Sequence, residues 1–239
     1  MIFFLQRPVG SDMAVAVAVT VLVVANLANN RWALSLWFVT SVLTILALYG
    51  ILWWAGATWS DVGLSRATVG WGAIWALALI IIVGICYAIA AVLPLTRGLF
   101  ADQRNIGLSA GAIAFRMFVK VPLGTVLLEE FAFRGVLYGL IRRGHGIIWA
   151  TAVSSLFFGL WHILPSAHLA MVKPALTPVF GHSTVGAVLA DATAVIFTAL
   201  AGAVFCELRR RSSSLLAPMG LHWATNALGY LVAFLTAGA

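Results

Sequence analysis

The sequence predicts an all-α fold, a polytopic bundle of transmembrane helices, and three observations support this class. Of the 239 residues, 63% are hydrophobic and only 9% are charged, whereas about one quarter of a typical soluble chain is charged. The mean hydropathy is +1.06. The apolar residues fall in long runs, and about 20 such residues cross the hydrocarbon core of a bilayer. A water-soluble globule is therefore excluded.

The apolar runs predict about seven spans in a single integral membrane domain. Their approximate bounds are 13–28, 32–55, 70–93, 122–140, 147–164, 184–206 and 215–236. The first run is expected to stay as a signal anchor, because a second apolar run follows it at once.

An interfacial helix is expected before the fourth span, over Ser109–Val121. Arg116 and Lys120 are four residues apart there, so they share one helical face. We interpret these two cations as reaching lipid headgroups, with steering of a substrate carboxylate as the alternative.

The basic residues predict the orientation of the chain. With the N-terminus inside, the inner side receives Arg7, Arg66, Arg142, Arg143, Arg209, Arg210 and Arg211, and the outer side receives Arg31, Arg97, Arg104 and Lys173. Positive loops face the cytoplasm, so we expect a cytoplasmic N-terminus and a C-terminus outside. Twelve of the 14 basic residues are Arg, a usage common in GC-rich bacteria, which favours a bacterial cell membrane. No basic stripe is present for nucleic acid.

Apart from Asp191, which is nearer a span end, five charged or histidine residues lie inside the expected spans: Glu129, Glu130, Arg134, His162 and His222. A charge at the centre of the bilayer costs about 2.5 to 3.5 kcal/mol, so each needs a partner or a function. Glu130 and Arg134 are four residues apart and share a face, whereas Glu129 is rotated by about 100° and lacks a partner at that spacing. Glu129 is therefore the candidate general base. The alternative is one buried ion network that only holds helices together.

Two histidines extend this set to other helices. His162 ends the expected fifth span, and His222 shares a face with Asn226 in the seventh. A carboxylate and an imidazole can deprotonate a water, while a second imidazole and an amide stabilise an oxyanion. Glu129, His162 and His222 equally form a zinc ligand set with an open position. Both versions of hydrolysis stay open.

The depths of these residues do not agree fully with the expected bounds. At 1.5 Å per residue, Glu129 and His222 both lie about 10 Å inside their spans, near the midplane. His162 instead lies close to the outer end of its span. Either the bounds are wrong by several residues, or the fifth span continues beyond Leu164.

Three ordered motifs resemble those of the CPBP family, the CAAX proteases and bacteriocin-processing enzymes also called Abi. They are Glu129-Glu130-x-x-x-Arg134, Phe158-x-x-x-His162 and His222-x-x-x-Asn226. The resemblance divides the chain into N-terminal transmembrane helices over 1–107 and a CPBP-like catalytic core over 108–236. It implies an intramembrane endopeptidase in which Glu129 activates water and His162 is the partner of Glu129. His222 and Asn226 would stabilise the oxyanion or act as ligands. Glu130, Arg134 and Phe158 would have supporting roles.

The resemblance leaves the cofactor and the substrate open. Both a metallopeptidase with zinc and a metal-free glutamate mechanism are attributed to the family, so zinc or no cofactor is expected. The expected partners are membrane lipid and a membrane-associated peptide or protein. The alternatives are a transporter or proton pathway, disfavoured by the lack of inverted repeats, and a non-catalytic scaffold or immunity-type protein. Segment 165–183 is expected to be a connector, with a lid as the alternative.

Overall fold

A computed structural model describes residues 10–167 and 169–236, and no strand occurs in these ranges. The long helices are α1 (Ser11–Leu27), α2 (Trp37–Trp54), α3 (Arg66–Val92), α7 (Tyr138–Trp161), α11 (Thr184–Ser212) and α12 (Leu216–Thr236). The short ones are α4 (Pro94–Arg97), α5 (Ala110–Phe115), α6 (Leu127–Glu130), α8 (Ile163–Ser166), α9 (Leu169–Val172) and α10 (Thr177–Phe180). Arg7 and His168 lie outside the described residues.

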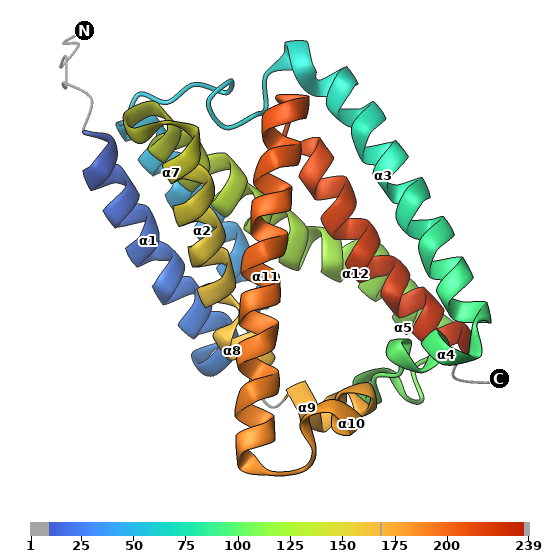
Figure 1. The fold of residues 1–239 in the computed structure, drawn as a ribbon. Coiled ribbons are helices and arrows are strands. Elements are labelled where there is room, and N and C mark those ends of the chain that lie inside the picture. Colours follow the sequence, from blue (N-terminus) through green and yellow to red (C-terminus); the bar gives the residue numbers. More distant parts are fainter. Residues whose placement is uncertain (1–9, 168, 237–239) are drawn as a thin grey trace, which may run out of the picture.

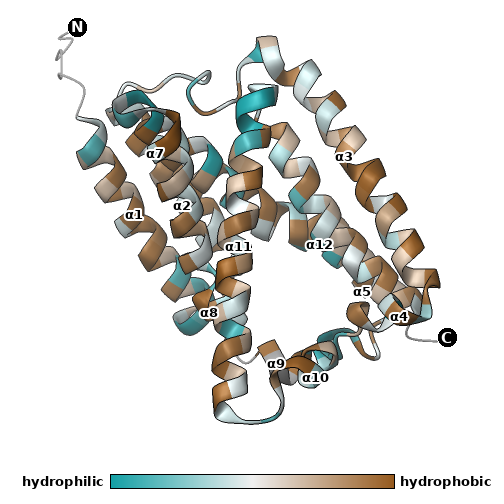
Figure 2. Cartoon of the chain, viewed as in Figure 1, coloured by the Kyte–Doolittle hydropathy of each residue, from teal (hydrophilic) through white to brown (hydrophobic). Residues whose placement is uncertain are grey.

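The described helices have the composition of membrane spans. Five stretches are long and apolar enough to cross a bilayer: Ser11–Trp32, Leu34–Trp54, Arg66–Val92, Ala110–Trp161 and Thr184–Ser212. Large apolar side chains face outward, as on α3, and hydrophilic residues gather towards the helix ends (Figure 2). The all-α membrane bundle is thus confirmed. The count of seven is not, since the expected fourth and fifth spans fall in one stretch and α12 is not among the five.

Gly146 divides the stretch Ala110–Trp161 into two antiparallel arms, which we call the hairpin. Its backbone, with φ 81° and ψ −176°, is not helical, and positive φ favours a residue without a Cβ. The arms lie side by side, because the Ser154 hydroxyl donates a 2.7 Å hydrogen bond to the Phe133 carbonyl. The first arm is 110–145 and the second is 147–161.

The segment expected as an interfacial helix is helical, but it is not a separate element. The first arm continues through π-helical turns at Arg116–Lys120, Pro122–Val126 and Phe131–Leu137. Pro122 takes the first position of such a turn. Its missing backbone N–H therefore disrupts the helical hydrogen bonds less than it would in the middle of a regular α-helix. Arg116 contacts protein there, donating to the Asn105 side chain at 3.0 Å.

Figure 1 shows how the helices are grouped. α1 and α2 pack with the hairpin on one side, α3 and α12 pack along each other on the other side, and α11 runs between them against α7. The two ends of the described chain lie at opposite ends of the bundle.

The two basic clusters, Arg142-Arg143 and Arg209-Arg210-Arg211, reach the same end of the bundle, at the connection between α2 and α3. Arg143 donates to the carbonyl of Ala55, and Arg209 donates to the carbonyls of Ser60 and Asp61. The two clusters therefore share one side, as the orientation requires. That this side is cytoplasmic stays a prediction.

Candidate functional site

The four acidic and imidazole side chains expected at the site converge inside the bundle. Glu129 Oε2 lies 3.8 Å from Nε2 of His162 and 3.9 Å from Nε2 of His222. Glu129 and Glu130 come from α6, His162 ends α7, and His222 comes from α12. His162 and His222 follow Glu129 by 33 and 93 residues in the sequence, yet both lie beside one oxygen of its carboxylate.

The hairpin explains why His162 reaches the depth of Glu129. Glu129 lies 17 residues before Gly146 and His162 lies 16 residues after it, so both are about 25 Å from the turn at 1.5 Å per residue. The helix of the first arm begins at Ala110, before the expected bound of the fourth span at residue 122. Helical structure also continues past Leu164, to Ser166 at the end of α8.

The ion pair expected from the four-residue spacing of Glu130 and Arg134 is present. Arg134 Nη1 lies 3.2 Å from Glu130 Oε1, and both side chains are fully buried. The guanidinium also lies over two aromatic rings, 3.9 Å from the centroid of Phe158 and 4.7 Å from that of Phe205. One carboxylate and two ring faces thus compensate a cation that has no access to solvent.

Hydrogen bonds at Nδ1 set the orientation of both imidazoles. Nδ1 of His162 lies 2.8 Å from the Phe158 carbonyl, and Nδ1 of His222 lies 2.8 Å from Glu130 Oε1. Both partners only accept, so Nδ1–H donates in each case. When each ring is neutral, its Nε2 therefore has the lone pair. In both histidines Nε2 is the ring nitrogen that lies near Glu129 Oε2.

Trp161 is a partner of Glu129 that the sequence reasoning missed. Its indole Nε1–H donates to Glu129 Oε1 at 3.2 Å. This partner lies 32 residues away, on the other arm of the hairpin, so it does not bear on the expectation that Glu129 lacks a partner at the four-residue spacing. The other oxygen, Oε2, is buried and has no hydrogen-bond partner within the described residues. The only signal in the sequence was the position of Trp161 directly before His162.

Phe205 of α11 is a second residue that the sequence reasoning missed. Its ring stacks on the imidazole of His222, with centroids 5.3 Å apart and an interplanar angle of 23°. Phe158 contacts the edges of both imidazoles, at 4.7 Å for His162 and 6.1 Å for His222. The two phenylalanines therefore surround the histidines with apolar surface.

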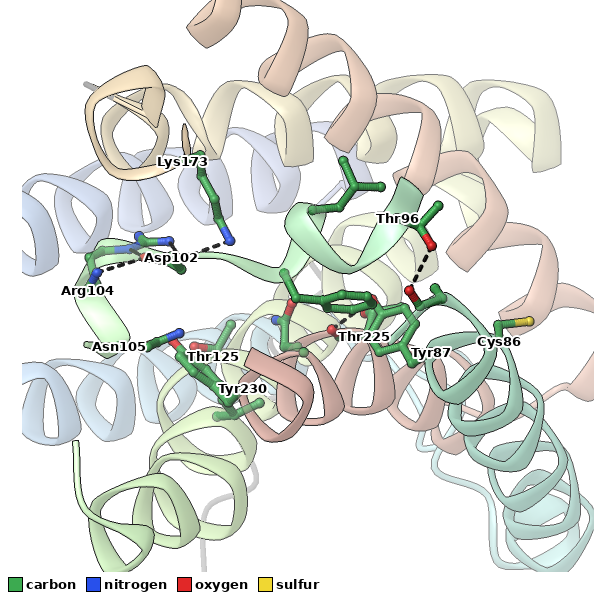
Figure 3. Close-up of a pocket in the computed structure, with 16 residues that line it drawn as sticks. Cys86, Tyr87, Thr96, Asp102, Arg104, Asn105, Thr125, Lys173, Thr225 and Tyr230 are labelled. Carbon is green, nitrogen blue, oxygen red and sulfur yellow. Dashed lines mark hydrogen bonds and ion pairs between the residues drawn. The ribbon is translucent and has the colours of Figure 1, made fainter. Parts of the chain in front are cut away.

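Asn226 lies one helical turn from His222 and lines a cavity of about 710 Å³. Thr125, one turn before Glu129, and Tyr230 also line it (Figure 3). None of Glu129, Glu130, His162 and His222 lines this cavity; Thr125 and Asn226 lie one helical turn from Glu129 and His222. Within the described residues no hydrogen bond or ion pair links the Asn226 side chain to Glu129 or to either imidazole, so the structure does not join its amide to the cluster directly.

An ionic cluster closes one part of the cavity wall. The carboxylate of Asp102 lies 2.6 Å from Arg104 and 3.0 Å from Lys173, which belongs to segment 165–183 (Figure 3). Burial opposes ionisation of Asp102, but hydrogen bonds from Arg104 and Lys173 outweigh it and hold the pKa of that carboxyl well below its usual range. Segment 165–183 is thus attached to the cavity by a charged contact.

The cluster only partly fits a metal ion. One carboxylate and two imidazoles whose Nδ1–H groups are already bound by oxygen are a donor set that suits zinc. However, no group of three or more His, Cys, Asp or Glu in the part of the chain that the structure describes is arranged so that it could hold a metal. No step is therefore derived through a metal.

Comparison with known proteins assigns the family. A family model described as type II CAAX prenyl endopeptidase, Rce1-like, matches residues 111–228, about half of the chain. No curated protein and no solved structure gave a match. The matched range contains both arms of the hairpin, α11 and the first part of α12, including every residue of the three motifs, and it agrees with the resemblance to the CPBP family. Through residues 111–228, the chain therefore belongs to the Rce1-like type II CAAX prenyl endopeptidase family.

Proposed function

We propose that this protein is an intramembrane endopeptidase that hydrolyses peptide bonds of membrane-associated peptides or proteins. The observation that carries the proposal is the position of Glu129 Oε2, within 3.9 Å of Nε2 of both His162 and His222. These separations exceed a direct hydrogen bond and fall within the span that one bridging water covers between a carboxylate and an imidazole.

In the proposed reaction, Glu129 and His162 activate the water. The water oxygen attacks the peptide carbonyl carbon, and its proton passes to the carboxylate or to the lone pair of Nε2. The C–N bond then breaks, the proton is delivered to the departing amine, and a carboxylate and an amine are released. The buried, preorganised site strengthens these electrostatic contacts.

His222 and Asn226 are proposed to stabilise the oxyanion. Because Nδ1–H of His222 already donates to Glu130, an Nε2–H donor requires the doubly protonated ring. Glu130 accepts the bond from Nδ1–H, and Arg134 holds its carboxylate in place. Glu130, Arg134 and Phe158 therefore have the supporting roles that the motifs imply.

The cavity is the proposed path of the peptide. Its wall includes Lys173, which lies between α9 and α10 in the sequence, and these two helices are at the end of the bundle opposite the connection between α2 and α3 (Figure 1). With the predicted orientation, in which the N-terminus is cytoplasmic, the peptide would approach from outside. In this proposal segment 165–183 forms part of the entrance.

Cleavage of a quenched-fluorescence peptide library by the purified protein in detergent or lipid nanodiscs tests the proposal. We expect Glu129→Gln and His162→Ala to lower kcat by at least about 100-fold, the lower range for removal of an acid–base group. Glu207→Gln is the matched control, because this glutamate is exposed and pairs only with neighbouring arginines on α11. Cleavage that survives both site substitutions, or a parent protein without cleavage, would overturn the proposed function.

A further inference from the structure

Trp161 holds Glu129 in one orientation. The carboxylate has two oxygens in different surroundings, since Oε1 accepts the indole N–H at 3.2 Å and Oε2 faces the histidines. A carboxylate without such a donor can rotate about its terminal torsion, which is broad. The indole bond removes that freedom and keeps Oε2 between the two imidazoles.

The indole itself is fixed by packing. Trp161 is 7% exposed, and its ring meets that of Phe133 edge-on, with centroids 5.7 Å apart. Phe133 lies four residues after Glu129 on the first arm of the hairpin, whereas Trp161 lies on the second. The donor and the acceptor therefore belong to two arms that already pack against each other, so little side-chain entropy is lost in forming the bond.

The backbone of Trp161 has an uncommon partner. In a helix its carbonyl would accept from the residue four positions later, which is Pro165, and proline has no N–H. The side-chain amide of Asn26 in α1 donates to this carbonyl instead, at 2.8 Å and in a buried position. An orphaned buried carbonyl would otherwise cost about 1 to 3 kcal/mol.

Asn26 is in turn held by a second amide. Asn30 donates both to the carbonyl of Asn26 and to its Oδ1, at 2.9 and 2.7 Å. The bond to Oδ1 assigns the oxygen and leaves the Asn26 amide nitrogen for Trp161. A chain of hydrogen bonds thus leads from α1, outside the family match over residues 111–228, to the carboxylate of Glu129.

We infer that Trp161 is a positioning residue for Glu129, and that Asn26 holds Trp161 in place from α1. The inference rests on the proposed function for its effect on catalysis, whereas the indole–carboxylate bond exists independently of it. Neither residue lies among those that line the cavity, so both act on the carboxylate and leave peptide binding unaffected.

Kinetics of two variants test the inference. We expect Trp161→Phe to lower kcat by about 10- to 100-fold, as for other groups that orient a reacting side chain, with KM changed less than about threefold. Asn26→Leu should lower kcat in the same way but less. Trp223→Phe is the matched control: this indole follows His222 and donates to the Met117 carbonyl at 3.0 Å, away from Glu129. Equal losses in Trp161→Phe and Trp223→Phe, or a loss expressed in KM, would overturn the inference.

Indole NMR supplies a readout that needs no activity. In protein with ¹⁵N-labelled tryptophan, the Trp161 indole resonance is the one missing from Trp161→Phe, or from Trp161→Tyr should the first variant not fold. We expect Glu129→Gln and Asn26→Leu to shift this resonance, because the first removes the charge at the acceptor and the second frees the residue's backbone. An indole resonance unchanged by Glu129→Gln refutes the positioning role, whereas absent cleavage in the parent with this shift present refutes only the proposed function.

Discussion

Nδ1 of His222 lies 2.8 Å from the same Glu130 oxygen, Oε1, that pairs with Arg134. One buried oxygen thus serves a structural cation and a site imidazole. The two roles of Glu130 can be separated by mutation, because the first needs Arg134 and the second needs His222.

Replacement of Glu130 by Gln should lower both stability and kcat. The buried guanidinium of Arg134 loses its counter-charge, which typically costs about 3 to 5 kcal/mol, and His222 loses the carboxylate that accepts from its Nδ1–H. Adding Arg134→Met should recover part of the unfolding free energy but none of kcat. Thermal unfolding and steady-state kinetics of the two single variants and the double variant measure this. Recovery of kcat in the double variant would contradict the role assigned to Glu130.

Removal of divalent metals should leave the rate of cleavage unchanged. The described residues contain no group of three or more side chains arranged to hold a metal, and the proposed steps use only a carboxylate and two imidazoles. Extended dialysis against a strong chelator, followed by assay with and without added zinc, measures the effect. Loss of cleavage that zinc restores would show that Glu129, His162 and His222 close around a metal.

Gly146→Ala should destabilise the hairpin by about 1 to 2 kcal/mol, since an L-residue at positive φ is strained. No atom lies within 4 Å of the added methyl group, so the strain of the backbone is the whole effect. Gly70→Ala in α3 is the matched control, because it also meets nothing within 4 Å but has helical φ; it should not lower stability. Unfolding in detergent compares the two, and equal midpoints would refute the assigned turn.

Asp102→Asn should loosen segment 165–183. The lowered pKa of Asp102 means that its stabilising contribution is complete above about pH 4, the unfolded value, and is lost only as the pH falls through the lower folded value. The difference in Tm between the parent and Asp102→Asn should therefore be constant from pH 8 to pH 5 and shrink below about pH 4.

The thiol of Cys86 offers a second measurement of the same change. Cys86 is exposed and lines the cavity, whereas Cys206 is buried. We expect maleimide to label Cys86 faster in Asp102→Asn than in the parent, and Cys86→Ser identifies the labelled position. An unchanged labelling rate would show that the ionic contact does not restrict the cavity.

Arg209→Met should lower stability by about 2 kcal/mol, because this buried cation donates to the carbonyls of Ser60 and Asp61. Arg211→Met provides the comparison. Arg211 is 62% exposed and pairs with Glu207, an arrangement that contributes at most about 1 kcal/mol. The unfolding midpoints of the parent and of both variants are compared, and equal shifts in Arg209→Met and Arg211→Met would contradict the anchoring role of Arg209.

The sequence predicted the features that follow from local spacing. The pairing of Glu130 with Arg134 needs only the four-residue period of a helix, and the family needs only the order of the three motifs. The class of fold follows from the length of the apolar runs. Each of these inferences requires no knowledge of which helices touch.

The features that the sequence did not predict depend on which helix face points inward. In a membrane bundle the lipid-facing and core-facing residues are both apolar, so hydrophobic periodicity carries little information. Phe205 and Trp161 therefore looked like ordinary apolar residues. The depth of His162 depends on the turn at Gly146. The sequence there contains two Arg and two Gly residues, and it does not indicate which one forms the turn.

The nearly equal distances of Glu129 and His162 from Gly146 along the chain restrict where residues can be inserted. Each residue inserted between Gly146 and Glu129, or between Gly146 and His162, would shift that arm by 1.5 Å and rotate its side chains by about 100°. One insertion would therefore turn the glutamate or the histidine away from its partner. Insertions before Glu129 or after His162 leave the distances from Gly146 to these two residues unchanged.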